Sequence, residues 1–232
     1  MAFGFEVKNS TGNVIIDETY QNLSLALKQD FNIASGATFD VTYSSAVAPL
    51  LCINSSGSLG YYRTTFSGST YTWRFKSSEA ASGSIYIFDK PHAAHVSSFG
   101  MKILASDGVT EVFNSDNKYL RVVELLSIPW SASFDGTRLG DSVTGAATSR
   151  TGLAISKYAV AMTSPRVATT GVDGNNNFTR VFDGVKTTTT SVTVAQTIPL
   201  SFFAGGNNDS PGFFANSGSG TVPAMIVNVE GF

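Results

Sequence analysis

Cysteine and histidine are nearly absent from this chain of 232 residues. The single cysteine, Cys52, excludes an internal disulfide, and because it lies in the apolar run at residues 48–53 we expect its thiol to be buried. The two histidines, His92 and His95, lie in one short connection without a cysteine nearby, so a zinc site there would lack ligands. We therefore expect no metal and no cofactor, and we interpret both histidines as ordinary linker residues.

Charge is also scarce. Charged residues make up 14% of the chain and the net charge is −2, which argues against a surface for nucleic acid or for an anionic membrane. No apolar run approaches the roughly 18 residues of a membrane-spanning helix. The N-terminus has neither the basic nor the apolar segment of a secretory signal. We therefore expect no nucleic-acid partner, no membrane insertion and no signal peptide.

Catalytic motifs are missing as well. The chain has no glycine-rich phosphate loop, no Gly-x-Ser-x-Gly motif and no cysteine and histidine pattern that indicates a thiol nucleophile. Asp17 and Glu18 are neighbours at a predicted strand end, where successive side chains point to opposite faces. A glycosidase needs two carboxylates that face one cleft. We therefore expect that the protein is not an enzyme.

Aromatic residues and glycine are plentiful, with 17 Phe, 8 Tyr and 22 Gly. Gly, Ser, Thr and Asn crowd the stretches between short apolar runs, a distribution typical of strands joined by turns. No window keeps apolar residues at the 3.6-residue spacing of an amphipathic helix. The sequence therefore predicts an all-β fold with few helices.

A segment near the N-terminus returns in the middle of the chain. FGFEVKNSTGNVIIDETYQNLSL, residues 3–25, is echoed by FGMKILASDGVTEVFNSDNKYLRV, residues 99–122. The pattern of each copy predicts a strand, a glycine-containing turn and a second strand. We infer a duplicated hairpin module and expect two β-sandwich-like domains: residues 1–95, and a larger second domain with loop insertions at residues 96–232. The alternative is two similar hairpins within one sandwich.

A further hairpin is predicted by YYRTTF and TYTWRF, which flank Ser-Gly-Ser at residues 67–69. Alternation along the strands directs Arg63 and Arg74 away from Tyr71 and Trp73. Tyr61, Tyr71 and Trp73 in an exposed position would form a flat platform for the apolar face of a sugar ring. Core packing of the same side chains is the alternative.

The second half of the chain contains long stretches rich in Gly, Thr, Asn and Asp, and such loops often carry specific contacts. Asp173, Asn175 and Asn177 alternate as at the start of a calcium loop, but Phe178 and Lys186 stand where that loop requires Gly and Glu. We therefore predict turns that contact a partner rather than an EF-hand. The candidate partner contacts are Asp173, Asn175, Asn177, Phe203, Asn207, Asn208 and Phe213.

The repeated segment also carries a resemblance. An aromatic-Gly opening, a strand, a Ser-x-Gly turn, a second strand ending in Asp or Asn, and then Tyr-Leu-Arg-Val resemble a poorly characterised group of tail-associated virion structural proteins of tailed bacteriophages. Residues 99–122 are the strongest part, although Met101 and the residues at 103–104 and 113–115 depart from the pattern of that group. The N-terminal copy departs from it at Asp17 and Glu18.

This resemblance implies a protein assembled in the host cytoplasm and built into the virion, at the tail tip, the baseplate or the fibre-attachment region. Its partners would be other virion proteins, and it would form a homo-oligomer or part of a symmetric ring. One alternative is a module that binds a host-surface polysaccharide or receptor. Another is a capsid decoration protein, since the sequence does not distinguish head from tail.

Overall fold

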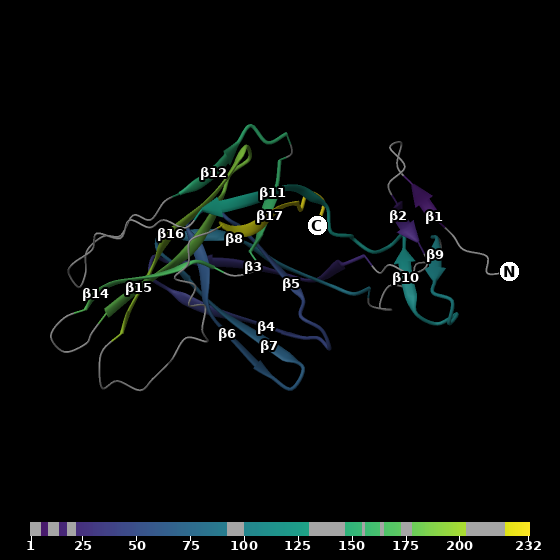
Figure 1. Cartoon of the computed structure of the whole chain (residues 1–232), viewed down its shortest axis with the longest axis horizontal. Coiled ribbons are helices and arrows are strands. Elements are labelled where there is room, and N and C mark those ends of the chain that lie inside the picture. Colours follow the sequence, from purple (N-terminus) through teal and green to yellow (C-terminus); the bar gives the residue numbers. More distant parts are fainter. Residues whose placement is uncertain are drawn as a thin grey trace.

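The computed structural model describes residues 6–8, 14–17, 22–91, 100–129, 147–154, 156–162, 165–172, 178–202 and 221–232. Within these residues the regular structure consists of seventeen strands and no helix, so the predicted all-β fold is confirmed (Figure 1). The strands are β1 (Glu6–Lys8), β2 (Val14–Asp17), β3 (Ser24–Ile33), β4 (Thr38–Ser44), β5 (Leu50–Ser55), β6 (Leu59–Ser67), β7 (Thr70–Ser77), β8 (Ala81–Asp89), β9 (Lys102–Leu104), β10 (Glu111–Asn114), β11 (Val122–Pro129), β12 (Thr148–Thr151), β13 (Tyr158–Met162), β14 (Val167–Val172), β15 (Phe178–Thr187), β16 (Ser191–Phe202) and β17 (Thr221–Asn228).

Two antiparallel sheets pack face to face as a β-sandwich. The six-stranded sheet has the order β11-β17-β13-β5-β8-β3, and the seven-stranded sheet has the order β12-β16-β15-β6-β7-β4 with β14 also paired to β15. The apolar core lies between them because side chains alternate along each strand. Val41, Leu59 and Phe75 are buried there from the seven-stranded sheet, and Ile53 and Ile226 from the six-stranded sheet.

Both halves of the chain contribute to both sheets. In the six-stranded sheet β13 pairs with β5 through Val160 and Ile53, and in the seven-stranded sheet β15 pairs with β6 through Val185 and Leu59. All four residues belong to one core cluster. The prediction of separate domains at residues 1–95 and 96–232 is therefore wrong. Each half supplies only part of each sheet, and the inner edges of the halves complete their backbone hydrogen bonds by pairing with each other.

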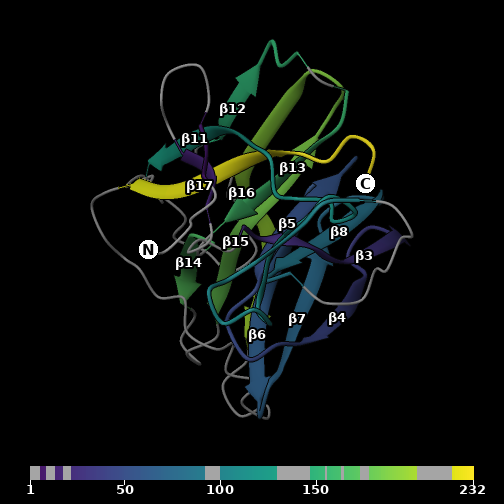
Figure 2. The same ribbon diagram turned by 90° about the vertical axis from the view of Figure 1, so that its right-hand side faces the viewer.

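The two halves nevertheless follow one strand order. After its hairpin, each half places its strands in the two sheets in the same order. β14 is an addition in the second half. The remaining strands correspond, so that β3, β4, β5, β6, β7 and β8 match β11, β12, β13, β15, β16 and β17. From the centre outward the six-stranded sheet contains β5-β8-β3 on one side and β13-β17-β11 on the other. Figure 2 shows β3 and β4 at one edge of the sandwich and β11 and β12 at the opposite edge. The strand order thus has an approximate two-fold symmetry.

The correspondence extends to residue register in the outer strands. Leu25 and Val122, which the sequence repeat aligns, occupy matching places: Leu25 pairs with Phe88 and Val122 pairs with Val227. Directly after each pair, the register shifts at a β-bulge. Bulges are specific features of a strand pair. The two outer strands thus share one register pattern around a bulge.

The two hairpins that the sequence repeat predicts are both confirmed as strand pairs. β1 pairs with β2 and β9 pairs with β10, and each pair forms a separate two-stranded sheet. The two hairpins lie next to one another at one end of the molecule (Figure 1). Residues 22–25 and 118–121, which we call the neck, join them to the sandwich and bond to each other, since Leu25 N donates to Lys118 O at 2.7 Å and Leu120 N donates to Leu23 O at 2.9 Å.

Candidate functional site

The tips of β14, β15 and β16 form the end of the sandwich away from the hairpins (Figure 1). Strand register places Val172 opposite Phe178, and Phe178 opposite Phe202. The last described residues beside segments 173–177 and 203–220 therefore lie together, at a place that we call the loop end. All the predicted partner contacts fall in these two segments and lie outside the described residues: Asp173, Asn175, Asn177, Phe203, Asn207, Asn208 and Phe213. What the structure brings together is the base of both loops.

A buried ion pair connects the two sheets near this end. Arg166, just before β14, and Asp183 in β15 have side chains that are both 0% exposed. Arg166 Nη2 donates to Asp183 Oδ1 at 2.7 Å, and the backbone N of Arg166 donates to Asp183 Oδ2 at 2.6 Å. Arg166 Nη1 donates to the carbonyl oxygen of Pro129 at 2.5 Å, at the end of β11 in the other sheet. The guanidinium therefore fixes the spacing of the two sheets at this point.

The electrostatics of this pair have two opposing contributions. Burial raises the pKa of Asp183, whereas the hydrogen bonds and positive charge of Arg166 lower it. Gln196, the cross-strand neighbour of Asp183, is also fully buried, and its amide oxygen and nitrogen have no hydrogen-bond partner among the described residues. Polar groups thus replace apolar packing in this part of the interior. Such a network specifies one geometry at the cost of desolvation.

The predicted aromatic hairpin is confirmed as β6 and β7, joined at Gly68, whose φ is 61°. Its sugar-platform interpretation is wrong for two of the three residues. Tyr61 and Trp73 are each only 5% exposed and belong to the core between the sheets, and Tyr61 Oη donates to the carbonyl oxygen of Met162 at 3.3 Å. A β-bulge in β6 between Tyr61 and Arg63 explains why Tyr61 shares the inner face with Trp73.

One aromatic pair of this hairpin does reach the surface. Phe66 is 60% exposed, and its ring centroid lies 4.6 Å from that of the half-buried Tyr71. Tyr71 in turn stacks on Trp73 at 5.7 Å. The exposed aromatic surface is therefore the tip of the hairpin rather than its middle.

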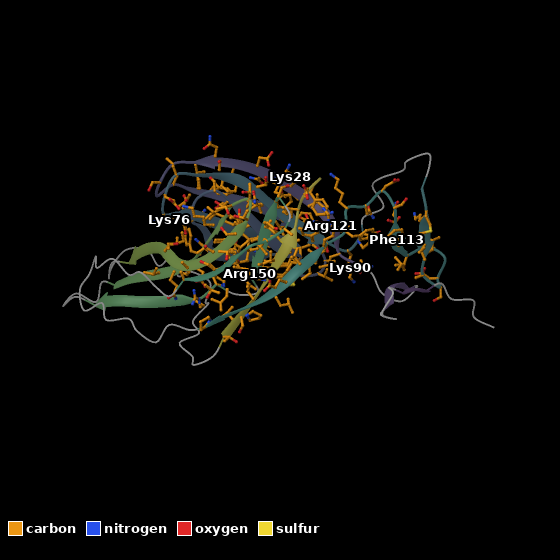
Figure 3. The ribbon with its side chains drawn as sticks, turned by 90° about the horizontal axis from the view of Figure 1, so that it is seen from above. Lys28, Lys76, Lys90, Phe113, Arg121 and Arg150 are labelled. Carbon is orange, nitrogen blue, oxygen red and sulfur yellow. The ribbon has the colours of Figure 1, made fainter. Side chains whose placement is uncertain are left out.

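The outer face of the six-stranded sheet is apolar and covered by the chain itself. Cys52, Tyr86 and Phe88 are fully buried there, beneath the neck and beneath Phe232. The expected burial of the thiol is confirmed, and burial raises the pKa of Cys52. Figure 3 shows Arg121 where the hairpins join the sandwich. The neck therefore has a packing role as well as a connecting one.

Among the described residues, no group of three or more His, Cys, Asp or Glu side chains is arranged to hold a metal ion. The two linker histidines, His92 and His95, lie outside those residues, as does Glu18, whereas Asp17 ends β2. The described part of the chain also contains no helix long and apolar enough to cross a membrane.

Sequence reasoning missed two features. Arg166 lies in a polar stretch with no local pattern that indicates burial, and only the pairing of β15 with β16 and β14 creates its site. The edge strand β11, in which Val122, Val123 and Leu125 are exposed, was also not singled out from the sequence. Comparisons of the chain with protein-family models, with curated proteins and with solved structures found no match.

Proposed function

We propose that this protein is a structural component of a tailed-phage virion, at the tail tip, the baseplate or the fibre-attachment region, and that it acts through protein–protein contacts. The observation that carries the proposal is the placement of the two hairpins and the loop end at opposite ends of one sandwich (Figure 1). A sandwich with different surfaces at its two ends is suited to connect two neighbours. The resemblance to virion proteins lies in the hairpins themselves.

The loop end supports an assembly role because strand pairing and a buried ion pair hold its base. β15 and β16 pair from Thr187 and Val192 to Phe178 and Phe202, with one register shift between Phe182 and Asp183, and Arg166 ties them to the other sheet. Loops on a rigid scaffold are the usual place for specific contacts. The loops would therefore dock onto a neighbouring subunit without reorganisation of the sandwich.

Replacement of residues 205–212 by a short Gly-Ser linker tests this role. We expect the unfolding free energy to change by less than about 0.5 kcal/mol, since the change lies beyond the paired strands. Incorporation into purified phage particles, measured by immunoblot, should be lost. A matched control replaces the exposed turn at residues 188–190, at the other end of the same two strands. Normal incorporation of the 205–212 variant would contradict the proposal.

A second candidate function is binding of a host-surface polysaccharide or receptor, which the exposed Phe66 and its contact with Tyr71 favour. Phe66→Ala removes an exposed ring, so the fold should persist while any glycan binding is lost. A glycan array with the wild-type protein and this variant separates the two functions. Immunogold labelling of particles distinguishes a tail position from capsid decoration.

A further inference from the structure

The edge strand β11 presents an apolar surface. Among the described strands only β17 pairs with it, so its other backbone edge has no described partner strand. Leu125 is 69% exposed, and Val122 and Val123 are 48% and 45% exposed. Cross-strand pairing places Leu125 beside the half-buried Met225. An exposed, apolar edge strand is a template for pairing with another chain.

The strand at the equivalent place in the first half has the opposite character. The pairing of β3 with β8 matches that of β11 with β17, including the position of the bulge. Counted from that bulge, Lys28 corresponds to Leu125 and Asp30 corresponds to Ser127. Lys28 and Asp30 are charged, their Nζ and Oδ1 atoms lie 3.9 Å apart, and such residues protect an edge against pairing. The fold places both strands at a sheet edge, so the difference between them comes from their side chains.

The charge on β11 favours a second copy of this chain as the occupant. Glu124 is the one charged residue of the strand, and its Oε2 lies 2.7 Å from Arg150 Nε of β12. Two β11 strands would therefore meet without an unpaired like charge. The molecule already joins two equivalent units by antiparallel edge pairing, at β5 and β13, where Ile53 pairs with Val160 and Cys52 pairs with Ala161.

We propose that β11 pairs in antiparallel fashion with β11 of a second copy, so that two six-stranded sheets become one continuous sheet across a two-fold axis. Leu125 lies near that axis and packs against Leu125 of the second copy. An isologous interface of this kind requires a self-complementary patch, which an apolar strand provides when its one charged residue, Glu124, is already paired with Arg150. This inference deepens the proposed assembly function, on which it rests, by naming one contact surface.

Leu125→Lys tests the interface because it gives β11 the side chain that β3 has at the equivalent place. Light scattering after gel filtration, from low to high micromolar concentration, should show a dimer for the wild type. The variant should dissociate about tenfold more readily or more, because two ammonium groups meet at the axis. Ser127→Asp, at an exposed polar position, provides a second variant with little risk to the fold.

Ala26→Lys is the matched control, because Ala26 is an exposed residue of β3. It should leave the dimer unchanged, and at concentrations where the wild type is monomeric all variants should keep the wild-type unfolding midpoint. A wild type that remains monomeric at every concentration would overturn the inference, as would a dimer that both β11 variants leave intact. Particle incorporation of the wild type tests the proposed function separately, so the failure of one is distinguishable from the failure of the other.

Discussion

The guanidinium carbon of Arg121 lies 4.5 Å from the centroid of the Phe232 ring. Arg121 belongs to the neck. The same Phe232 ring also packs on Phe88, with ring centroids 5.8 Å apart, and Phe88 belongs to the apolar outer face of the six-stranded sheet. Lys118 adds a hydrogen bond from Nζ to the carbonyl oxygen of Gly231 at 2.7 Å. Residues 229–232 thus connect the base of the hairpins to the sandwich.

Phe232→Ala should therefore lower the unfolding free energy by about 1–3 kcal/mol, since the half-buried ring covers apolar surface and accepts a cation–π contact. Phe66→Ala is the matched control, because Phe66 is 60% exposed and its removal should change stability far less. Urea unfolding of both variants gives the comparison. Equal losses for the two variants would show that Phe232 does not cover the outer face.

The buried ion pair leads to an asymmetric prediction. Asp183→Asn leaves a buried guanidinium and Arg166→Met leaves a buried carboxylate, and each change should cost about 3–5 kcal/mol at neutral pH. Without the Arg166 guanidinium, only the backbone N of residue 166 still opposes the effect of burial on Asp183, so the pKa of that carboxyl rises further. As pH falls the carboxyl is protonated in the fold, so Arg166→Met should recover stability toward acid while Asp183→Asn should not.

The double variant Arg166→Met/Asp183→Asn is the control for that experiment. It removes both charges, so it should be less destabilised than the sum of the single variants. Denaturant unfolding at two pH values completes the cycle. Additive losses, or identical pH dependence of the two single variants, would contradict a direct charge pair.

Cys52 gives a prediction toward alkaline pH. Burial raises the pKa of its thiol above the ordinary value, which is about 8.5 for an exposed cysteine. The neutral thiol therefore contributes full stability below that value, and stability falls at higher pH because the unfolded chain ionises first. From pH 7 to pH 10 the wild type should lose about 2 kcal/mol more than Cys52→Ala. Tyrosine ionisation is common to both proteins and cancels in the difference, so equal losses would indicate an accessible thiol.

The sequence predicted local structure because local patterns carry it. Alternation and a glycine turn were sufficient for β6 and β7, and for the separation of Arg63 and Arg74 from the face of Trp73. The bulge that turns Tyr61 inward has no such pattern, which is why the platform prediction failed. The pairing between the two halves could not be predicted either, because Ile53 and Val160 are distant in sequence and no local pattern specifies their register.

Trp73→Ala distinguishes core packing from recognition. Trp73 is 5% exposed and lies between the sheets, so its removal should cost about 3–5 kcal/mol through loss of buried area and formation of a cavity. Thermal unfolding with glycan binding measured on the same sample gives both readouts. A variant of unchanged stability that loses glycan binding would contradict the core assignment.

The shared sheets predict that neither half folds as an independent monomer. Residues 1–95 alone would expose the inner edges of β5 and β6, which the whole chain covers with β13 and β15. The fragment would also lack Val160 and Val185, which share a core cluster with Ile53 and Leu59, so these two buried side chains would become partly exposed. Two unpaired strand edges and an incompletely covered core favour either an unfolded chain or self-association.

Expression of residues 1–95 followed by light scattering and heteronuclear NMR should therefore yield no folded monomer. A monomeric fragment with dispersed resonances and a cooperative unfolding transition would mean that one half holds a complete core, and the pairing of β5 with β13 would then be a docking contact rather than part of the fold.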